Sequence, residues 1–110
     1  MKRRRSLEWR FEGRVIEWRG PAPYLFVALD ARDTDDIKDL ARGVAYWGQV
    51  PVIVTIGKTE FTTAMWPKDG RYLVPIKVAV QRAENISRGD SVRGRLRIAG
   101  RDESRRPFRG

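Results

Sequence analysis

Residues 7–14 alternate between apolar and mostly charged side chains, a pattern with a period of two. This period is typical of a β-strand that is buried on one face only. The phase of the alternation changes at Val15, because Ile16 and Trp18 are the next apolar positions. We therefore expect a strand over residues 7–18 that carries a bulge or a strong bend near its middle.

Five more segments have the composition of strands. Residues 24–29 are almost continuously apolar, which favours burial on both faces. Pro51 has no backbone N–H, so we expect its strand to lie at an edge of the sheet or to carry a bulge there. Gly57 and Lys58 have the composition of a two-residue hairpin turn. The predicted strands are residues 7–18, 24–29, 49–56, 59–66, 71–76 and 91–99.

Two short segments have helical patterns. The first helix is expected to begin after a cap at Asp33 or Thr34 and to end before Gly43. Its apolar face is predicted from the helical spacing of Ile37, Leu40 and Ala41. The second helix is expected to end near Asn85. The predicted helices are residues 33–42 and 77–84.

The order of these elements is the same in both halves of the chain. Each half reads strand, strand, helix, strand, the first over residues 7–56 and the second over residues 59–99. Any two amphipathic helices share the same apolar spacing, so the pattern leaves open whether the halves form a true pseudo-repeat. The chain is predicted to be mainly β, a six-stranded barrel with two short helices.

Length and composition indicate one small domain. The 110 residues fit a single domain, which we place at residues 7–99 between two basic tails, 1–6 and 100–110, that we expect to be disordered. The chain has no cysteine and no histidine. Disulfides, thiolate chemistry and the commonest general base are therefore excluded. An enzyme is the least expected class, and we predict no cofactor and no metal site.

The net charge of +9 is concentrated at the two ends of the chain. Residues 1–10 carry +4 and residues 101–110 carry +2, whereas the 90 residues between them carry only +3. A basic tail can bind nucleic acid through counterion release, although a solvated tail more often only aids solubility. No apolar run approaches the length of a membrane span, and no signal sequence is recognisable, so we expect a cytoplasmic protein.

Aromatic side chains supply a first candidate site, for a small molecule. Aromatic residues grouped with a few polar groups are typical of ligand pockets, although packing in a barrel core explains them equally well. Trp18 and Arg19 stand next to a Gly- and Pro-rich loop, where functional residues are common. Lys77 could act as a base and Arg82 as an anion clamp, or each could form a structural ion pair. The predicted ligand-binding residues are Trp18, Arg19, Tyr24, Tyr72, Lys77 and Arg82.

Arginines supply a second candidate site, for nucleic acid. Alternate residues of the last strand are arginine, which places them together on its outer face, where they could follow a phosphate backbone. Alternating arginines also keep a strand face soluble and discourage edge pairing. The predicted nucleic-acid-binding residues are Arg3, Arg4, Arg5, Arg93, Arg95 and Arg97.

Three groups of residues, in order along the chain, resemble the motifs of one bacterial family. They are Trp18–Tyr24 with Phe26 and Val27; Trp47, Gly48, Val50–Val52, Ile56 and Gly57; and Gly70, Tyr72, Leu73, Pro75, Lys77, Arg82–Glu84, Gly89 and Asp90. The family is the DUF1905 domain, whose function is unknown, and the similarity covers roughly residues 8–98. Ala64 stands where the family pattern leads us to expect a serine.

The resemblance implies a double-split β-barrel, similar in architecture to the AbrB-type transition regulators. Those regulators are dimers in which each chain supplies strand, strand, helix, strand. The resemblance provides no catalytic residue. We therefore expect an uncharacterised bacterial domain, a monomer or homodimer, that binds a small molecule or a protein partner without catalysis. The alternative hypothesis is an AbrB-like nucleic-acid-binding protein that uses its basic tails and its arginine-rich strand face.

Overall fold

The computed structural model describes residues 8–18, 24–42 and 48–99. The predicted basic tails, 1–6 and 100–110, lie outside the described residues. Along the chain the strands are β1 (Glu8–Arg14), β2 (Ile16–Trp18), β3 (Tyr24–Ala28), β4 (Val50–Ile56), β5 (Thr59–Lys68), β6 (Arg71–Ile76) and β7 (Ser91–Ile98). The helices are α1 (Ala31–Leu40), between β3 and β4, and α2 (Val78–Glu84), between β6 and β7.

The strands form one curled antiparallel sheet in the order β1-β7-β4-β5-β6-β3-β2. The sheet has seven strands rather than the predicted six, because the predicted strand 7–18 is divided at Val15. Val15 is buried, its N–H donates to the carbonyl of Asp90 at 2.8 Å, and its carbonyl accepts from the N–H of Gly89 at 2.9 Å. The predicted bend is therefore confirmed, and the two edge strands are consecutive in the chain.

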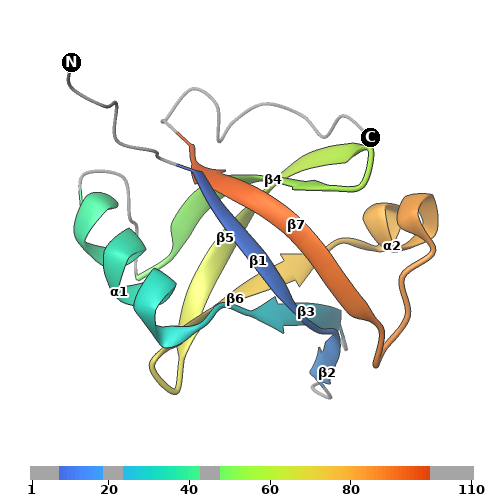
Figure 1. Ribbon diagram of the computed structural model, residues 1–110, viewed down its shortest axis with the longest axis horizontal. Coiled ribbons are helices and arrows are strands. Elements are labelled where there is room, and N and C mark those ends of the chain that lie inside the picture. Colours follow the sequence, from blue (N-terminus) through green and yellow to red (C-terminus); the bar gives the residue numbers. More distant parts are fainter. Residues whose placement is uncertain (1–7, 19–23, 43–47, 100–110) are drawn as a thin grey trace.

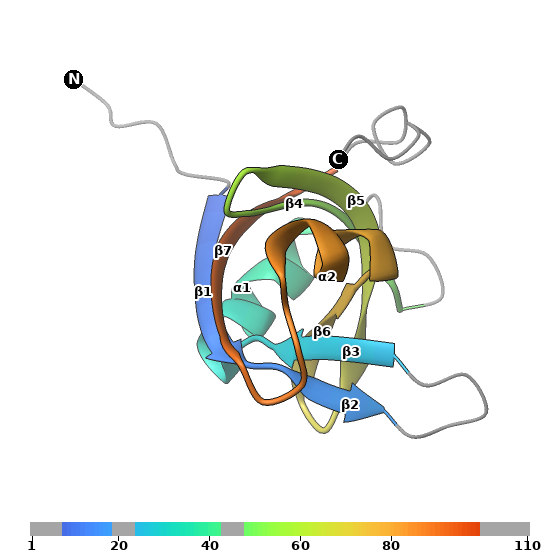
Figure 2. The ribbon, with the colours of Figure 1, turned by 90° about the vertical axis from the view of Figure 1, so that its right-hand side faces the viewer.

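The two helices lie at opposite ends of the curled sheet. Figure 1 shows α1 and α2 on the two sides of the strands, with β1 and β7 side by side between them. Figure 2 looks along the sheet from the α2 side, so that the strands surround α2 in front and α1 behind. Each helix therefore covers one open end of the curled sheet.

Apolar side chains on the inner face of the sheet fill the space between the helices. Alternate residues of β4 and β5 point inward, as the period of a strand requires. Phe61 and Met65 of β5 and Leu96 of β7 are among the largest side chains that are almost completely buried. The predicted last strand is confirmed, because Val92 and Leu96 are buried while the arginines between and beyond them are exposed.

Helix α1 begins two residues earlier than predicted. Its N-cap is Asp30, whose side chain accepts from the backbone N–H of Asp33 at 2.8 Å, so the expected cap at Asp33 or Thr34 is wrong. Thr34 is instead buried: its hydroxyl donates to the carbonyl of Asp30 at 2.9 Å and accepts from the N–H of Tyr72 at 3.1 Å. Of the predicted apolar face, Ile37 and Ala41 are buried, whereas Leu40 is 40% exposed.

A carboxylate attaches the C-terminal turn of α2 to the β4–β5 hairpin. Glu84 Oε2 accepts from the Thr59 hydroxyl at 2.7 Å and from the backbone N–H of Lys58 at 3.2 Å. The chain then leaves the helix at Asn85, which adopts the left-handed conformation at φ 54°. The predicted helix end and the predicted two-residue hairpin turn at Gly57 and Lys58 are therefore confirmed.

Strand β4 lies in the interior of the sheet, between β7 and β5, and Pro51 pairs with Ala64 in unbroken register, so the expected edge position or bulge at Pro51 is wrong. The carbonyl of Pro51 accepts from the N–H of Ala99 at 2.9 Å, just after β7 ends. Because the nitrogen and carbonyl of one strand residue point to the same side, the missing N–H faces this end of β7 and not β5. Proline is therefore tolerated without loss of a β4–β5 hydrogen bond. Within the described ranges, neither helix has the length and apolarity needed to cross a membrane.

Candidate functional site

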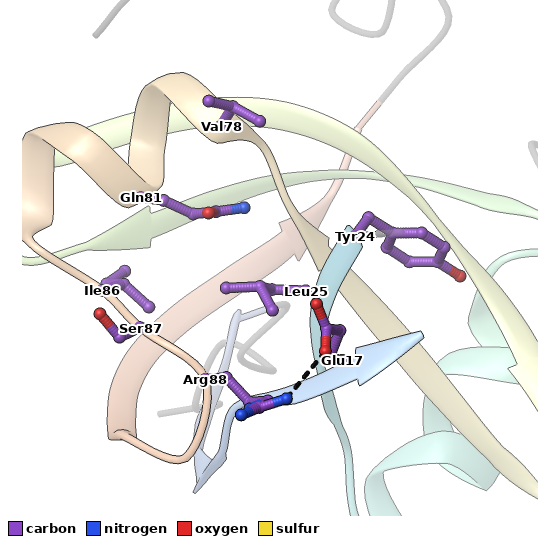
Figure 3. Close-up of a pocket in the computed structure, with 8 residues that line it drawn as sticks. All are labelled: Glu17, Tyr24, Leu25, Val78, Gln81, Ile86, Ser87 and Arg88. Carbon is purple, nitrogen blue, oxygen red and sulfur yellow. Dashed lines mark hydrogen bonds and ion pairs between the residues drawn. The ribbon is translucent and has the colours of Figure 1, made fainter. Parts of the chain in front are cut away.

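A groove of about 630 Å³ opens between α2 and the β2–β3 pair. Figure 3 shows side chains from both walls pointing toward this space. We call it the α2 groove. Its lining residues are Glu17, Tyr24, Leu25, Val78, Gln81, Ile86, Ser87 and Arg88. The volume falls within the range of about 300–1,000 Å³ that small-molecule sites occupy.

The floor and upper wall of the α2 groove are apolar. Leu25 lies on the inner face of β3 and Ile86 lies in the segment after α2, and each is 9% exposed. Val78, in the first turn of α2, is 59% exposed, although it is a large hydrophobic side chain. An apolar ligand body in this groove would remove Val78 from water, which is favourable by about 25 cal/mol per Å² of buried area.

The lower rim of the α2 groove carries an ion pair. Arg88 Nη1 lies 3.0 Å from Glu17 Oε1, and the two side chains are 64% and 30% exposed. The dashed line in Figure 3 marks this contact between the turn after α2 and strand β2. Gln81 lines the groove from α2, and its Nε2 donates to the carbonyl of Ile76 at 2.9 Å. The rim therefore presents a guanidinium, a carboxylate and an amide around an apolar floor.

The α2 groove is open because α2 fills its end of the sheet less completely than α1 does. Helix α1 has ten residues, and Thr34, Ile37 and the C-cap residue Ala41 are buried against the strands. Helix α2 has seven residues, of which only Val80 is buried. The groove is the space that this short helix leaves beside the sheet.

Four aromatic side chains pack together on the outer face of the sheet beside the groove. The ring centroids of Trp18 and Trp66 lie 6.2 Å apart in an edge-to-face arrangement, and those of Trp18 and Tyr24 lie 6.5 Å apart. Tyr24 also lies 6.1 Å from Trp66 and 5.8 Å from Phe26. These separations are within the range in which aromatic pairs attract one another. We call Trp18, Tyr24, Phe26 and Trp66 the aromatic cluster.

Tyr24 belongs to both the α2 groove and the aromatic cluster. It begins β3, directly opposite Trp18 of β2 in the sheet register. Burial raises the pKa of the Tyr24 phenol. Its ring packs against Phe26 and Trp66 and points away from Leu25 (Figure 3), so the phenol lies on the side of the aromatic cluster.

Of the five predicted ligand-binding residues that the structure describes, Trp18 and Tyr24 pack against each other. Tyr72 is buried on the inner face of β6, where its carbonyl accepts from the N–H of Leu29 at 2.9 Å, and burial raises the pKa of its phenol. Lys77 is the exposed N-cap residue of α2, and Arg82 is exposed in the last turn of that helix. Arg19 lies outside the described residues.

The outer face of β7 presents arginines that pair with carboxylates of β1. Arg93 Nη2 lies 3.7 Å from Glu12 Oε2, and Arg95 Nε lies 3.3 Å from Glu8 Oε2. These ion pairs partly neutralise the arginine-rich strand face, on which Arg97 is also exposed. The remaining predicted nucleic-acid-binding residues, Arg3, Arg4 and Arg5, lie outside the described residues.

Two carboxylates of the acidic surface at α1 have roles in capping and packing, Asp30 as the N-cap and Asp36 as the acceptor for Trp9. Trp9 Nε1 donates to Asp36 Oδ2 at 3.0 Å, which ties α1 to β1. Burial, followed by the neighbouring carboxylates Asp30 and Asp36, raises the pKa of Asp33. In the described part of the chain, no three His, Cys, Asp or Glu side chains come together in a way that could hold a metal ion.

Sequence reasoning missed the residues of the groove rim. Ser87, Arg88 and their neighbours have turn composition, and their proximity to β2 depends on the turn at Gly89, which folds back to Val15. The inward position of Glu17, in contrast, could have been predicted from the sequence. The change of phase at Val15 places this charged residue on the inward side of the strand, between the outward-facing Ile16 and Trp18.

Residues 11–96, most of the chain, match the model of a family described as a domain of unknown function, DUF1905. Both the α2 groove and the aromatic cluster lie within the matched range. A search of curated proteins found no match.

Proposed function

The chain belongs to the DUF1905 domain family. We propose that it is a non-enzymatic binding module that holds a small molecule in the α2 groove. The observation that carries the proposal is the combination of an apolar floor and an exposed guanidinium in one groove. Ligand sites use apolar side chains to contact the body of a ligand and polar groups to fix its orientation, and the α2 groove offers both kinds.

The groove favours a ligand with an apolar body and one negatively charged group. Leu25, Ile86 and Val78 would contact the apolar body. Arg88 would bind the carboxylate or phosphate, because a guanidinium forms two parallel hydrogen bonds to such groups. The net charge of +9 also raises the local concentration of anions around the protein.

We expect small organic anions to stabilise the protein against heat. A ligand present at 100 times its Kd adds about 2.7 kcal/mol to the free energy of unfolding, which corresponds to a rise of about 10–20 °C in Tm. The measurement is a thermal-shift screen of small carboxylates and organic phosphates, each tested beside its uncharged amide or alcohol. The Arg88→Gln variant should lose about 10- to 100-fold in affinity for the anions, since a hydrogen bond to a charged group is worth about 1.5–3 kcal/mol.

A matched control separates the groove from general charge effects. Arg42, in the turn after α1, has an 82% exposed side chain that pairs with Asp39 at 3.5 Å, so Arg42→Gln removes the same charge far from the groove. This variant should retain the affinity of the unmodified protein. If Arg42→Gln and Arg88→Gln weaken binding equally, or if no anion raises Tm, the groove proposal is wrong.

The proposal extends to the architecture, which we infer to be a double-split β-barrel with a pseudo-two-fold repeat, as in AbrB-type regulators. The strand pairings support it. In the proposed repeat, β1 and β2 together correspond to β5, β3 corresponds to β6, and β4 corresponds to β7. The pairing of β1 with β7 then corresponds to the pairing of β5 with β4. The pairing of β2 with β3 corresponds to the pairing of the end of β5 with β6. The other two pairings, β4 with β7 and β3 with β6, each join one element of the first half to its counterpart in the second.

The register supports the same equivalence residue by residue. Phe11 lies opposite Gly94 of β7, and Phe61 lies opposite Val54 of β4. If Phe11 and Phe61 are counterparts, Val15 corresponds to Met65, and both of these side chains are almost completely buried. In this arrangement β1 and β2 together correspond to the single long strand β5, which reduces seven strands to six.

A further inference from the structure

The aromatic cluster has the features of a stacking surface. Tyr24 and Phe26 lie on the face of β3 opposite to Leu25 and Val27, which belong to the core. Phe26 is 6% exposed, so it forms the base of the cluster, whereas Trp18 is 38% exposed and presents its ring to solvent. The outer face of this part of the sheet is therefore aromatic, although the inner face already contains the core.

The turn between β5 and β6 brings cations to the aromatic cluster. Lys68 Nζ lies 5.6 Å from the centroid of the Trp18 ring, a cation–π contact. Arg71 lies opposite Lys68 in the β5–β6 register and is exposed, with its Nε donating to the carbonyl of Leu29 at 2.5 Å. One carboxylate lies in the same turn, because Asp69 Oδ2 is 3.8 Å from Lys68 Nζ. Two cations and one carboxylate give this turn a positive balance.

We propose that the aromatic cluster binds single-stranded nucleic acid. Unpaired bases present flat faces that stack on tryptophan and tyrosine rings without regard to sequence, and the phosphates between them need cations close to the rings. Trp18 supplies the exposed ring, and Lys68, which lies 5.6 Å from the centroid of that ring, supplies the cation that would pair with the neighbouring phosphate when a base takes its place on the ring. A duplex hides the faces of its bases, so the arrangement selects single strands over duplexes.

This surface differs from the α2 groove and from the arginines of β7. Only Tyr24 is shared with the groove, and neither Trp18 nor Lys68 lines it. The arginines of β7 bind glutamates of β1, whereas Lys68 is held over an aromatic ring. Binding of nucleic acid to the aromatic cluster can therefore be tested independently of small-molecule binding in the groove.

The test is the fluorescence anisotropy of a labelled oligo-dT strand titrated with the full chain at low salt. Trp18→Ala should weaken binding by about 5- to 150-fold, the range expected for loss of one stacked base. Trp18→Phe, which keeps an aromatic face, should retain most of the affinity. Lys68→Gln should weaken binding. It should also reduce, by about 0.7, the steepness with which the logarithm of the association constant falls with the logarithm of the salt concentration, because one phosphate contact is lost.

Lys38→Gln is the matched control, because Lys38 is an exposed lysine on α1, a helix that contributes no residue to the aromatic cluster. This variant should bind oligo-dT as the unmodified protein does, and a duplex of the same length should bind more weakly. Three results would overturn the proposal: no binding at low salt, equal affinity of the Trp18→Ala, Lys68→Gln and unmodified proteins, or equal affinity for single strand and duplex.

Discussion

Replacing Phe61 with alanine is expected to lower the free energy of unfolding by about 3–5 kcal/mol. Phe61 is 1% exposed and lies on the inner face of β5, opposite Val54 of β4. Truncation removes a large apolar side chain and leaves a cavity that the two antiparallel strands cannot collapse to fill. The measurement is chemical denaturation followed by tryptophan fluorescence, with the free energy obtained by linear extrapolation.

Two further variants are compared with Phe61→Ala. Thr62→Ala changes the next residue of the same strand, whose side chain points to the other face, and should alter stability by no more than about 0.5 kcal/mol. Phe11→Ala should cost nearly as much as Phe61→Ala, since the proposed pseudo-repeat makes the two residues counterparts. A loss below about 1 kcal/mol for Phe61→Ala would contradict its place in the core.

Replacing Gly94 with valine is expected to lower the free energy of unfolding by about 2–3 kcal/mol, because the core is overpacked there. Gly94 lies in β7, opposite Phe11 of β1 and Ile56 of β4. A Cβ at this position would lie 2.7 Å from the carbonyl oxygen of Thr55 and 2.8 Å from Cζ of Phe11. The carbonyl belongs to the backbone of the neighbouring strand, so the contact cannot be relieved by a change of rotamer.

Arg95→Val provides the control for Gly94→Val. It introduces the same β-branched side chain on the next residue of β7, where the side chain faces solvent and forms an exposed ion pair with Glu8. Loss of such a pair costs about 0–1 kcal/mol, and valine favours strands. Equal destabilisation by the two variants would show that β7 does not pass as close to Phe11 and Thr55 as its register requires.

The strands were predictable from the sequence because their periodicity is strong and their turns have distinctive composition. The alternation before Val15, the change of phase there and the hairpin at Gly57 all correspond to features of the structure. The interior position of Pro51 was not predictable. It depends on where β7 ends relative to β4, and that relation is set by the packing of two segments far apart in the chain.

The helices show how tertiary contacts override local preference. Asp33 and Thr34 both have good capping side chains, but β3 ends at Ala28 and Asp30 is the first cap available after it. Thr34 is then carried to the inner face, where the backbone N–H of Tyr72 needs an acceptor. A single-sequence pattern contains no information about that acceptor.

The candidate site was predictable only in part. Trp18 and Tyr24 could be selected because aromatic residues beside a Gly- and Pro-rich loop stand out along the chain. The groove, in contrast, is built from β2, β3, α2 and the turn after it. Arg88, which supplies the guanidinium, has only the sequence pattern of a turn residue. Its position 3.0 Å from Glu17 depends on how the chain folds back, which the sequence pattern does not indicate.

The central claim, that the α2 groove is a ligand site, is tested most directly by mapping backbone amide chemical shifts. The ¹⁵N-labelled protein is titrated with the organic anion that gives the largest rise in Tm. We expect shifts concentrated at Leu25, Gln81, Ile86 and Arg88, which line the groove, and no such shifts in the Arg88→Gln variant at the same ligand concentration. Shifts confined to the arginine face of β7 or to the basic ends of the chain would contradict the claim.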